Sequence, residues 1–167
     1  MNKYVPLNQN NTWQNVYTKA HRVPMNVKLK EFQYKFLHDA LVNGYWLYKW
    51  KISETEICTV CGNGTDNIKH VYWECQSTQH FWAEFKEWWF LKYGQIHLDI
   101  EDIFFGTEQE LLCHLIFIAK QHIYIQRIQD KAPDIVYYIN MVDHVKRIEE
   151  NIARKNNRYD IWLEKWT

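Results

Sequence analysis

Cys58-Thr59-Val60-Cys61, followed by His70 and Cys75, is the stretch that decides the fold of this chain. Three cysteines and one histidine within eighteen residues are the ligands that a structural zinc ion takes in a tetrahedral site. The Cys-x-x-Cys spacing lets one tight turn aim two sulfur atoms at the same metal. The pattern therefore predicts one zinc ion, held by Cys58, Cys61, His70 and Cys75.

The residues after the first two cysteines indicate how the chain returns to the metal. Gly62 and Gly64 supply the positive φ angles that such a turn needs. Asp66-Asn67-Ile68 has the form of a helix start, which places His70 on the returning arm. His80 is an alternative fourth ligand. We favour His70, because it lies between the two cysteine arms with loops short enough to close.

Disulfide formation and redox chemistry are two alternative uses of the cysteines. Together with Cys113 they could form two disulfides in a secreted chain, but the polar start of the sequence lacks the apolar run of a signal peptide. A redox pair would place Cys58-x-x-Cys61 between a strand and a helix, whereas a glycine-containing turn follows here. Zinc-binding cysteines also favour an intracellular location, nuclear or cytoplasmic.

Composition favours one mainly α-helical domain with a single CCHC zinc knuckle. The chain is 47% hydrophobic and 17% aromatic, which excludes disorder, and five Gly and three Pro in 167 residues favour long helices. No apolar run approaches the ~20 residues that span a membrane. We expect N-terminal helices over residues 1–56, the knuckle over 57–76 and C-terminal helices over 77–167.

Charge is balanced overall but unevenly distributed. The 20 basic and 20 acidic side chains cancel, which argues against a strong nucleic-acid binder. Residues 1–35 carry six basic and one acidic group, a net of +5, whereas residues 74–110 carry two and eight, a net of −6. The basic arm could follow phosphates, and two ordinary solvated faces explain the distribution equally well.

Three segments before the knuckle have the pattern of helices. Asn10-Asn11-Thr12 can cap a short helix that carries Trp13. Apolar residues recur at three- and four-residue steps from Lys28 to Val42, and Gly44 would end that helix. Tyr45 to Ile52 is aromatic-rich, and we expect it to form a helical piece that leads into the zinc turn.

After the knuckle, the apolar spacing predicts three helices and two shorter pieces. Ser77 or Thr78 would cap the first, and Thr107-x-x-Glu110 has the form of a capping box before the most apolar one. The first helix carries Phe81, Trp82, Phe85, Trp88 and Trp89, which we assign to the core, and Gly94 ends it. The short piece Asp99–Phe105 follows and ends at Gly106. The remaining segments are Leu111–Ile123, a long helix that begins after Pro133 and Asp134, and Tyr159–Trp166.

Several longer motifs together resemble a known family. They are Trp13-x-x-Val16-Tyr17, residues 28–38 (KLKEFQYKFLH), residues 58–61 (CTVC), residues 66–75 (DNIKHVYWEC) with Phe81-Trp82, residues 102–106 (DIFFG), residues 119–127 (AKQHIYIQR), Pro133 and Trp166. Over residues 12–167 the chain resembles the C-terminal zinc-binding region of the polyprotein of LINE-like retrotransposons, which lack long terminal repeats. That region lies downstream of the reverse transcriptase.

The resemblance implies a non-catalytic, zinc-binding module for nucleic acid, either RNA or single-stranded DNA. It would position template RNA or target DNA and act beside the reverse-transcriptase portion of a polyprotein. No Tyr-x-Asp-Asp motif occurs, so the polymerase site itself is not in this chain. The alternative is a zinc-stabilised structural or protein-interaction domain, domesticated from a retroelement. We expect no membrane and no small-molecule substrate as partner.

Basic and aromatic residues near the zinc turn are the candidate nucleic-acid contacts. Exposed aromatic rings beside lysines can stack on unpaired bases, while lysine and arginine contact phosphates. A plain solvated face is an equally good explanation for Lys120, Arg127 and Arg154. The full set is Lys28, Lys30, Lys35, Trp46, Tyr48, Lys49, Trp50, Lys51, Lys120 and Arg127, with Arg154 as a further phosphate contact.

The sequence does not favour a catalytic site. Pro133-Asp134, Asp143 and Lys146 superficially fit a nuclease motif, but Asp134 and Asp143 lie nine residues apart on one predicted helix and would point to opposite sides. Four protein ligands also close a zinc site to chemistry. We expect His114, His122 and His144 to be surface or helix-face residues and Cys113 to be a small core side chain.

Overall fold

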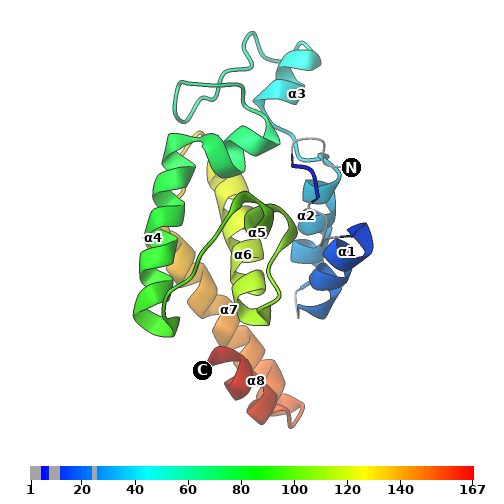
Figure 1. Ribbon diagram of the computed structural model, residues 1–167, viewed down its shortest axis with the longest axis vertical. Coiled ribbons are helices and arrows are strands. Elements are labelled where there is room, and N and C mark those ends of the chain that lie inside the picture. Colours follow the sequence, from blue (N-terminus) through cyan, green and yellow to red (C-terminus); the bar gives the residue numbers. More distant parts are fainter. Residues whose placement is uncertain (1–4, 8–11, 24–25) are drawn as a thin grey trace.

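The computed structural model describes residues 5–7, 12–23 and 26–167, and its regular elements are helices (Figure 1). The one extended pairing in this part of the chain is an antiparallel bridge between Ile57 and Thr65. The prediction of a mainly helical fold is confirmed. The elements are α1 (Trp13–Arg22), α2 (Val27–Leu37), α3 (Gly44–Lys49), the π-helical turn η1 (His70–Glu74), α4 (Gln76–Tyr93), α5 (Ile100–Phe105), α6 (Glu110–Arg127), α7 (Ile135–Lys155) and α8 (Tyr159–Trp166).

Helix α6 is the centre of the domain. Every residue from Leu111 to Lys120 is buried, so this helix is covered on all sides. It packs against α2, α5, η1, α7 and α8. The predicted apolar helix is therefore confirmed, and Cys113 lies in the core as expected.

Aromatic rings fill the space between α4 and α7. Phe81, Phe85 and Trp89 of α4 are almost completely buried. The Phe81 ring meets Tyr138 of α7 edge-on, with ring centroids 5.5 Å apart. Each buried aromatic side chain of this kind contributes roughly 1.5–3 kcal/mol to stability. The prediction that the aromatic side of α4 faces the core is confirmed.

Helix α2 is shorter than the periodicity predicted. It ends at Leu37, because Asp39 takes a left-handed conformation (φ 52°) and the N–H of Ala40 donates to the carbonyl of Lys35. Gly44 therefore does not end α2; it is the first residue of α3. The prediction that Gly44 ends this helix was wrong.

Helix starts agree with the predictions only in part. Helix α4 begins directly after Cys75, and the Thr78 hydroxyl donates to the carbonyl of Val71, so neither Ser77 nor Thr78 is the cap. Helix α6 begins at Glu110, and the Thr107 hydroxyl donates to a carbonyl, so the predicted capping box is absent there. Thr12, Asp99 and Asp134 cap α1, α5 and α7; Asn10 and Asn11 lie outside the described residues.

The two ends of the molecule differ in construction. Figure 1 shows α3 and the knuckle loop at one end and α8 at the other, with α6 and α7 between them. In the described part of the chain, no helix combines the length and apolar composition that crossing a bilayer requires. The knuckle thus sits at the end of a helical body, on top of α4 and α6.

Candidate metal centre

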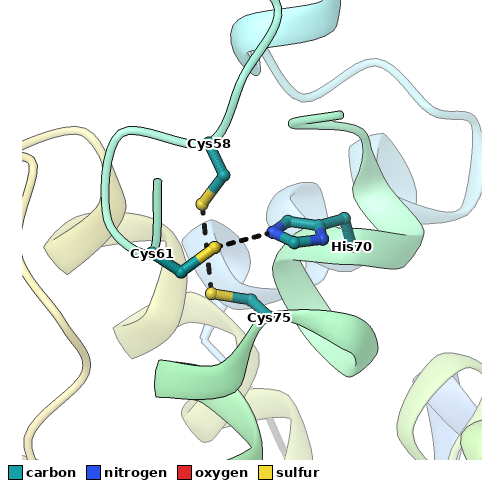
Figure 2. Close-up of side chains that lie close together, drawn as sticks. All are labelled: Cys58, Cys61, His70 and Cys75. Atoms are coloured by element: carbon teal, nitrogen blue, oxygen red, sulfur yellow. Dashed lines mark hydrogen bonds between the residues drawn. The ribbon is translucent and has the colours of Figure 1, made fainter. Parts of the chain in front are cut away.

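The four predicted zinc ligands meet at one point (Figure 2). One ligand atom from each of Cys58, Cys61, His70 and Cys75 lies within 4.8 Å of every other. The sulfur atoms of Cys58 and Cys75 are 3.9 Å apart, and Cys61 Sγ is 3.3 Å from His70 Nε2. A tetrahedral zinc site with ordinary bond lengths has S···S and S···N separations of about 3.8 and 3.5 Å. The group therefore fits a zinc ion.

The turn that carries the first two ligands depends on glycine. The N–H of Gly62 donates to the carbonyl of Cys58, and the N–H of Cys58 donates to the carbonyl of Gly64. Both glycines have positive φ angles, 69° and 71°. A Cβ atom on Gly64 would lie only 2.8 Å from Nδ1 of His70. Gly64 is therefore required both by the backbone and by the ligand ring beside it.

The π-helical turn η1 brings the other two ligands together. Asn67 Oδ1 accepts the N–H of His70, which confirms a helix start at this point. The N–H of Cys75 donates to the carbonyl of His70, the five-residue bond of a π turn. Figure 2 shows both side chains pointing at the cysteine turn. The alternative ligand, His80, is 76% exposed and pairs with Glu84.

The paired sulfur atoms favour one thiolate even without metal. The hydrogen bond from Cys58 and the backbone N–H groups of Thr78 and Ser77 lower the pKa of Cys75 to about 4, although burial opposes this. The same hydrogen bond, together with burial, raises the pKa of Cys58. Because zinc binds the thiolate form, a lowered Cys75 pKa favours metal binding.

A buried ion pair connects the knuckle to the end of helix α6. Asp66 is 2% exposed; its Oδ2 atom accepts the N–H of Gly44 at 2.6 Å and pairs with the guanidinium of Arg127. Arg127 also donates to the hydroxyl of Thr59, which in turn donates to Asp130. The end of α6 is thus joined to the zinc turn. Sequence reasoning missed this link, because nothing in local spacing pairs residue 66 with residue 127.

Of the predicted phosphate contacts, Lys120 is wrong, and Arg127 is already engaged within the protein. Lys120 is fully buried, its Nζ atom donates to the carbonyl of Phe104, and burial holds its pKa well below the usual value. The Arg127 side chain is 11% exposed and is held by Asp66. Both basic groups bond to other parts of the protein. Arg154 lies at the surface and pairs with Glu150, so its contact with phosphate stays a prediction.

Aromatic and basic side chains gather on α3 and the two residues that follow it. The rings of Trp46 and Trp50 are stacked with their centroids 5.9 Å apart, and Trp50 is 54% exposed. Lys49 and Lys51 are exposed, and the Lys49 ammonium lies 5.3 Å from the centroid of the Tyr45 ring. Of the other candidates, Tyr48 is exposed on α3, and Lys28, Lys30 and Lys35 are exposed on α2, where Lys35 pairs with Glu31.

Two of the histidines are not surface residues. His114 is 2% exposed, and burial, followed by the charge of Lys165, lowers its pKa to about 3. His122 is fully buried and accepts the N–H of Asp134. His144 is exposed, as predicted. Asp134 caps α7 by accepting the N–H of Tyr137, which accounts for the acid that had suggested a nuclease motif.

Comparison with known proteins agrees with this geometry. Residues 2–82 match a family model described as zinc-binding in reverse transcriptase. No curated protein and no solved structure matched the chain. The match and the Cys58, Cys61, His70 and Cys75 cluster together fit a zinc-binding region of a reverse transcriptase, with zinc as its cofactor. The match ends inside α4, so Arg127 lies outside it although it contacts the knuckle.

Proposed function

We propose, for a chain whose residues 2–82 fit a zinc-binding region of a reverse transcriptase, a non-catalytic role in binding single-stranded nucleic acid. Its contact surface is formed by Trp46, Tyr48, Lys49, Trp50 and Lys51, here called the α3 surface. The observation that carries the proposal is the exposure of Trp50 between two exposed lysines, in the segment that precedes the cysteine turn. In a polyprotein, this surface would hold template RNA or target DNA for the polymerase.

The chemistry of the α3 surface suits an unpaired strand. Stacking of a base on an aromatic side chain is worth roughly 1–3 kcal/mol and tolerates any sequence. The indole of Trp50 is already stacked on one face by Trp46, so a base can extend the stack on the other side. Lys49 and Lys51 can contact the phosphates on either side of that base. A regular duplex hides its base faces and fits this surface less well.

The zinc knuckle would keep the α3 surface in place. The N–H groups of Gly44 and Tyr45, at the start of α3, donate to the side chain and the carbonyl of Asp66. Asp66 lies between the cysteine turn and His70, so α3 is fastened to the ligand arms. A fastened surface loses less conformational entropy when it binds a strand. Binding should therefore need zinc.

A titration of labelled single-stranded RNA and DNA tests the proposal. We expect affinity to fall as salt rises, and Lys49→Glu with Lys51→Glu to weaken binding and flatten the salt slope by about one unit for each lost contact. Trp50→Ala should weaken binding, whereas Phe90→Ala, at another exposed aromatic residue on α4, should not. A titration that stays flat at low salt and high protein concentration would overturn the proposal.

A second candidate is a protein-interaction role. An open groove along α6, α7 and α8 is lined by Leu29, Ile118, Val145, Ile152 and Ile161, and the last two are more than half exposed. Balanced net charge also suits this role better than nucleic-acid binding. It predicts association with the reverse-transcriptase portion that changes little with salt. Ile152→Asp should weaken that association and leave RNA titrations unchanged.

A further inference from the structure

We propose that Arg127 is a positioning residue of the metal centre, and that the second half of the chain is thereby part of the zinc-binding unit. This inference does not depend on the nucleic-acid role. It rests on one observation: a single guanidinium, on the last residue of α6, contacts both arms that carry the ligands.

The two contacts of Arg127 are made with the two segments that carry the ligands. Thr59, whose hydroxyl accepts from Nη1 at 3.3 Å, stands between Cys58 and Cys61. Asp66, which pairs with Nη2, stands four residues before His70. The planar fork of arginine suits such a double contact, because its donors are fixed relative to one another. Movement of Arg127 would therefore shift the cysteine turn and the histidine arm together.

The loop that carries the first two cysteines cannot provide this support by its own packing. Between residues 50 and 67, Cys58 and Asp66 are the buried positions. One is a ligand, and the other is the partner of Arg127. Without zinc or the ion pair, this stretch has almost no buried apolar side chain to hold its conformation. The contacts of Arg127 thus supply the order that a larger core would supply elsewhere.

Charge balance points the same way. Three thiolates and one zinc ion leave the site with a net charge of −1, and Asp66 adds another negative charge beside it. Arg127 is largely buried, and although burial opposes it, the hydrogen bond and charge of Asp66 and the sulfur atoms of Cys58 and Cys75 raise its pKa. The guanidinium therefore stays charged and compensates the site. Outer contacts of this kind typically change metal affinity 10–100-fold when removed.

The test is zinc affinity in the full chain, measured by competition with a chromophoric chelator. We expect Arg127→Gln and Asp66→Asn each to weaken zinc binding about 10–100-fold. The double variant should lose less than the two single losses combined, because both substitutions remove the pair between Arg127 and Asp66. Arg127→Lys, which keeps the charge but not the fork, should recover part of the loss. Arg154→Gln, at an exposed ion pair, should bind zinc like the wild type.

Cobalt substitution separates positioning from general stability. The d–d absorption of Co²⁺ in a three-sulfur, one-nitrogen site should shift or broaden in Arg127→Gln at full occupancy, and it should keep its shape in Leu112→Val, a core change in α6. Should Arg127→Gln fail to fold, Thr59→Val decides, since it removes the contact of Arg127 to the cysteine turn, together with the bond to Asp130, and leaves the pair with Asp66 in place. It should still weaken zinc binding several-fold. Wild-type zinc affinity in Arg127→Gln, or in Thr59→Val if that variant decides, would overturn the proposal.

Discussion

Gly64 combines two constraints that no other residue type satisfies together. Its φ of 71° is unfavourable for a side chain, and an added Cβ would meet the His70 ring at 2.8 Å. Gly64→Ala should therefore displace the ring and weaken zinc binding by at least about tenfold, with a loss of roughly 1–3 kcal/mol in stability. The matched control is Gly62→Ala, because Gly62 also has a positive φ angle but has open space where its Cβ would lie.

Competition for zinc and thermal unfolding measure these two effects. Gly62→Ala should lose stability through backbone strain and keep most of its zinc affinity, since nothing lies within 4 Å of its added methyl group. Equal zinc affinities in the two variants would show that the contact with His70 does not matter.

Lys120 makes stability depend on pH at the alkaline end. Its ammonium is fully buried, and burial lowers its pKa from 10.5. The unfolded chain then binds the proton more tightly than the folded one. Stability should rise by up to about 1.4 kcal/mol per pH unit as pH increases from the folded pKa to 10.5, and should be level below that range. Denaturant unfolding of wild type and Lys120→Met across pH 7–10.5 measures the difference.

In Lys120→Met this rise should disappear, and other titrating groups cancel in the comparison of the two proteins. The stability of the wild type relative to Lys120→Met should therefore rise with pH. A constant gap between them would show that the lysine has an ordinary pKa in the fold. Sequence reasoning placed this lysine on the surface, because charged residues are rarely fully buried. Only the packing of Phe36 and Phe117 around its side chain reveals otherwise.

Among the elements, the helices could be predicted but several of their ends could not. Apolar spacing located α2, α4, α6 and α7, because burial of a helix face is visible as periodicity. The end of α2 was misplaced, since Asp39 and not a glycine takes the left-handed position. Gly44 was misread for a tertiary reason: a Cβ there would lie 2.6 Å from Asp66 Oδ2, so its small size serves a contact.

Helix α3 ends with a lysine in a left-handed backbone conformation. The N–H of Ile52 donates to Leu47 and that of Lys51 to Tyr48, with Lys51 in the left-handed conformation (φ 58°). A lysine at this position costs about 1 kcal/mol relative to glycine. Lys51→Gly should therefore raise the melting temperature by roughly 2–4 °C. If the α3 surface binds phosphate, the same change should weaken RNA binding.

The control for this prediction is Asn157→Gly, at the corresponding end of α7. Asparagine tolerates the left-handed region, so its gain should be smaller. Differential scanning calorimetry gives both melting temperatures, and an RNA titration gives the affinity. A destabilised Lys51→Gly would mean that its side chain makes contacts in the fold that outweigh the backbone strain.

For the molecule as a whole, the metal centre was the most predictable part and its attachment the least. Ligand spacing is local, so Cys58, Cys61, His70 and Cys75 could be named from the sequence. The clamp by Arg127 joins residues far apart in the chain, and no single-sequence pattern encodes it. The family match stops at residue 82, whereas the contacts of the knuckle extend to Asp130.

Removal of zinc should loosen one end of this molecule and leave the other folded. Residues 50–67, which carry the first two ligands, have almost no buried apolar side chain, whereas α4, α6 and α7 share a core that includes Phe81, Leu115 and Tyr138. Metal analysis should first give one zinc per chain. A strong chelator should then lower the melting temperature by roughly 10 °C or more and leave most of the helical circular dichroism at room temperature. Added zinc should restore the original melting temperature, which excludes irreversible damage by the chelator. Complete loss of helical signal would show that the helices cannot hold together without the knuckle, and an unchanged melting temperature would show that the metal does not stabilise the fold.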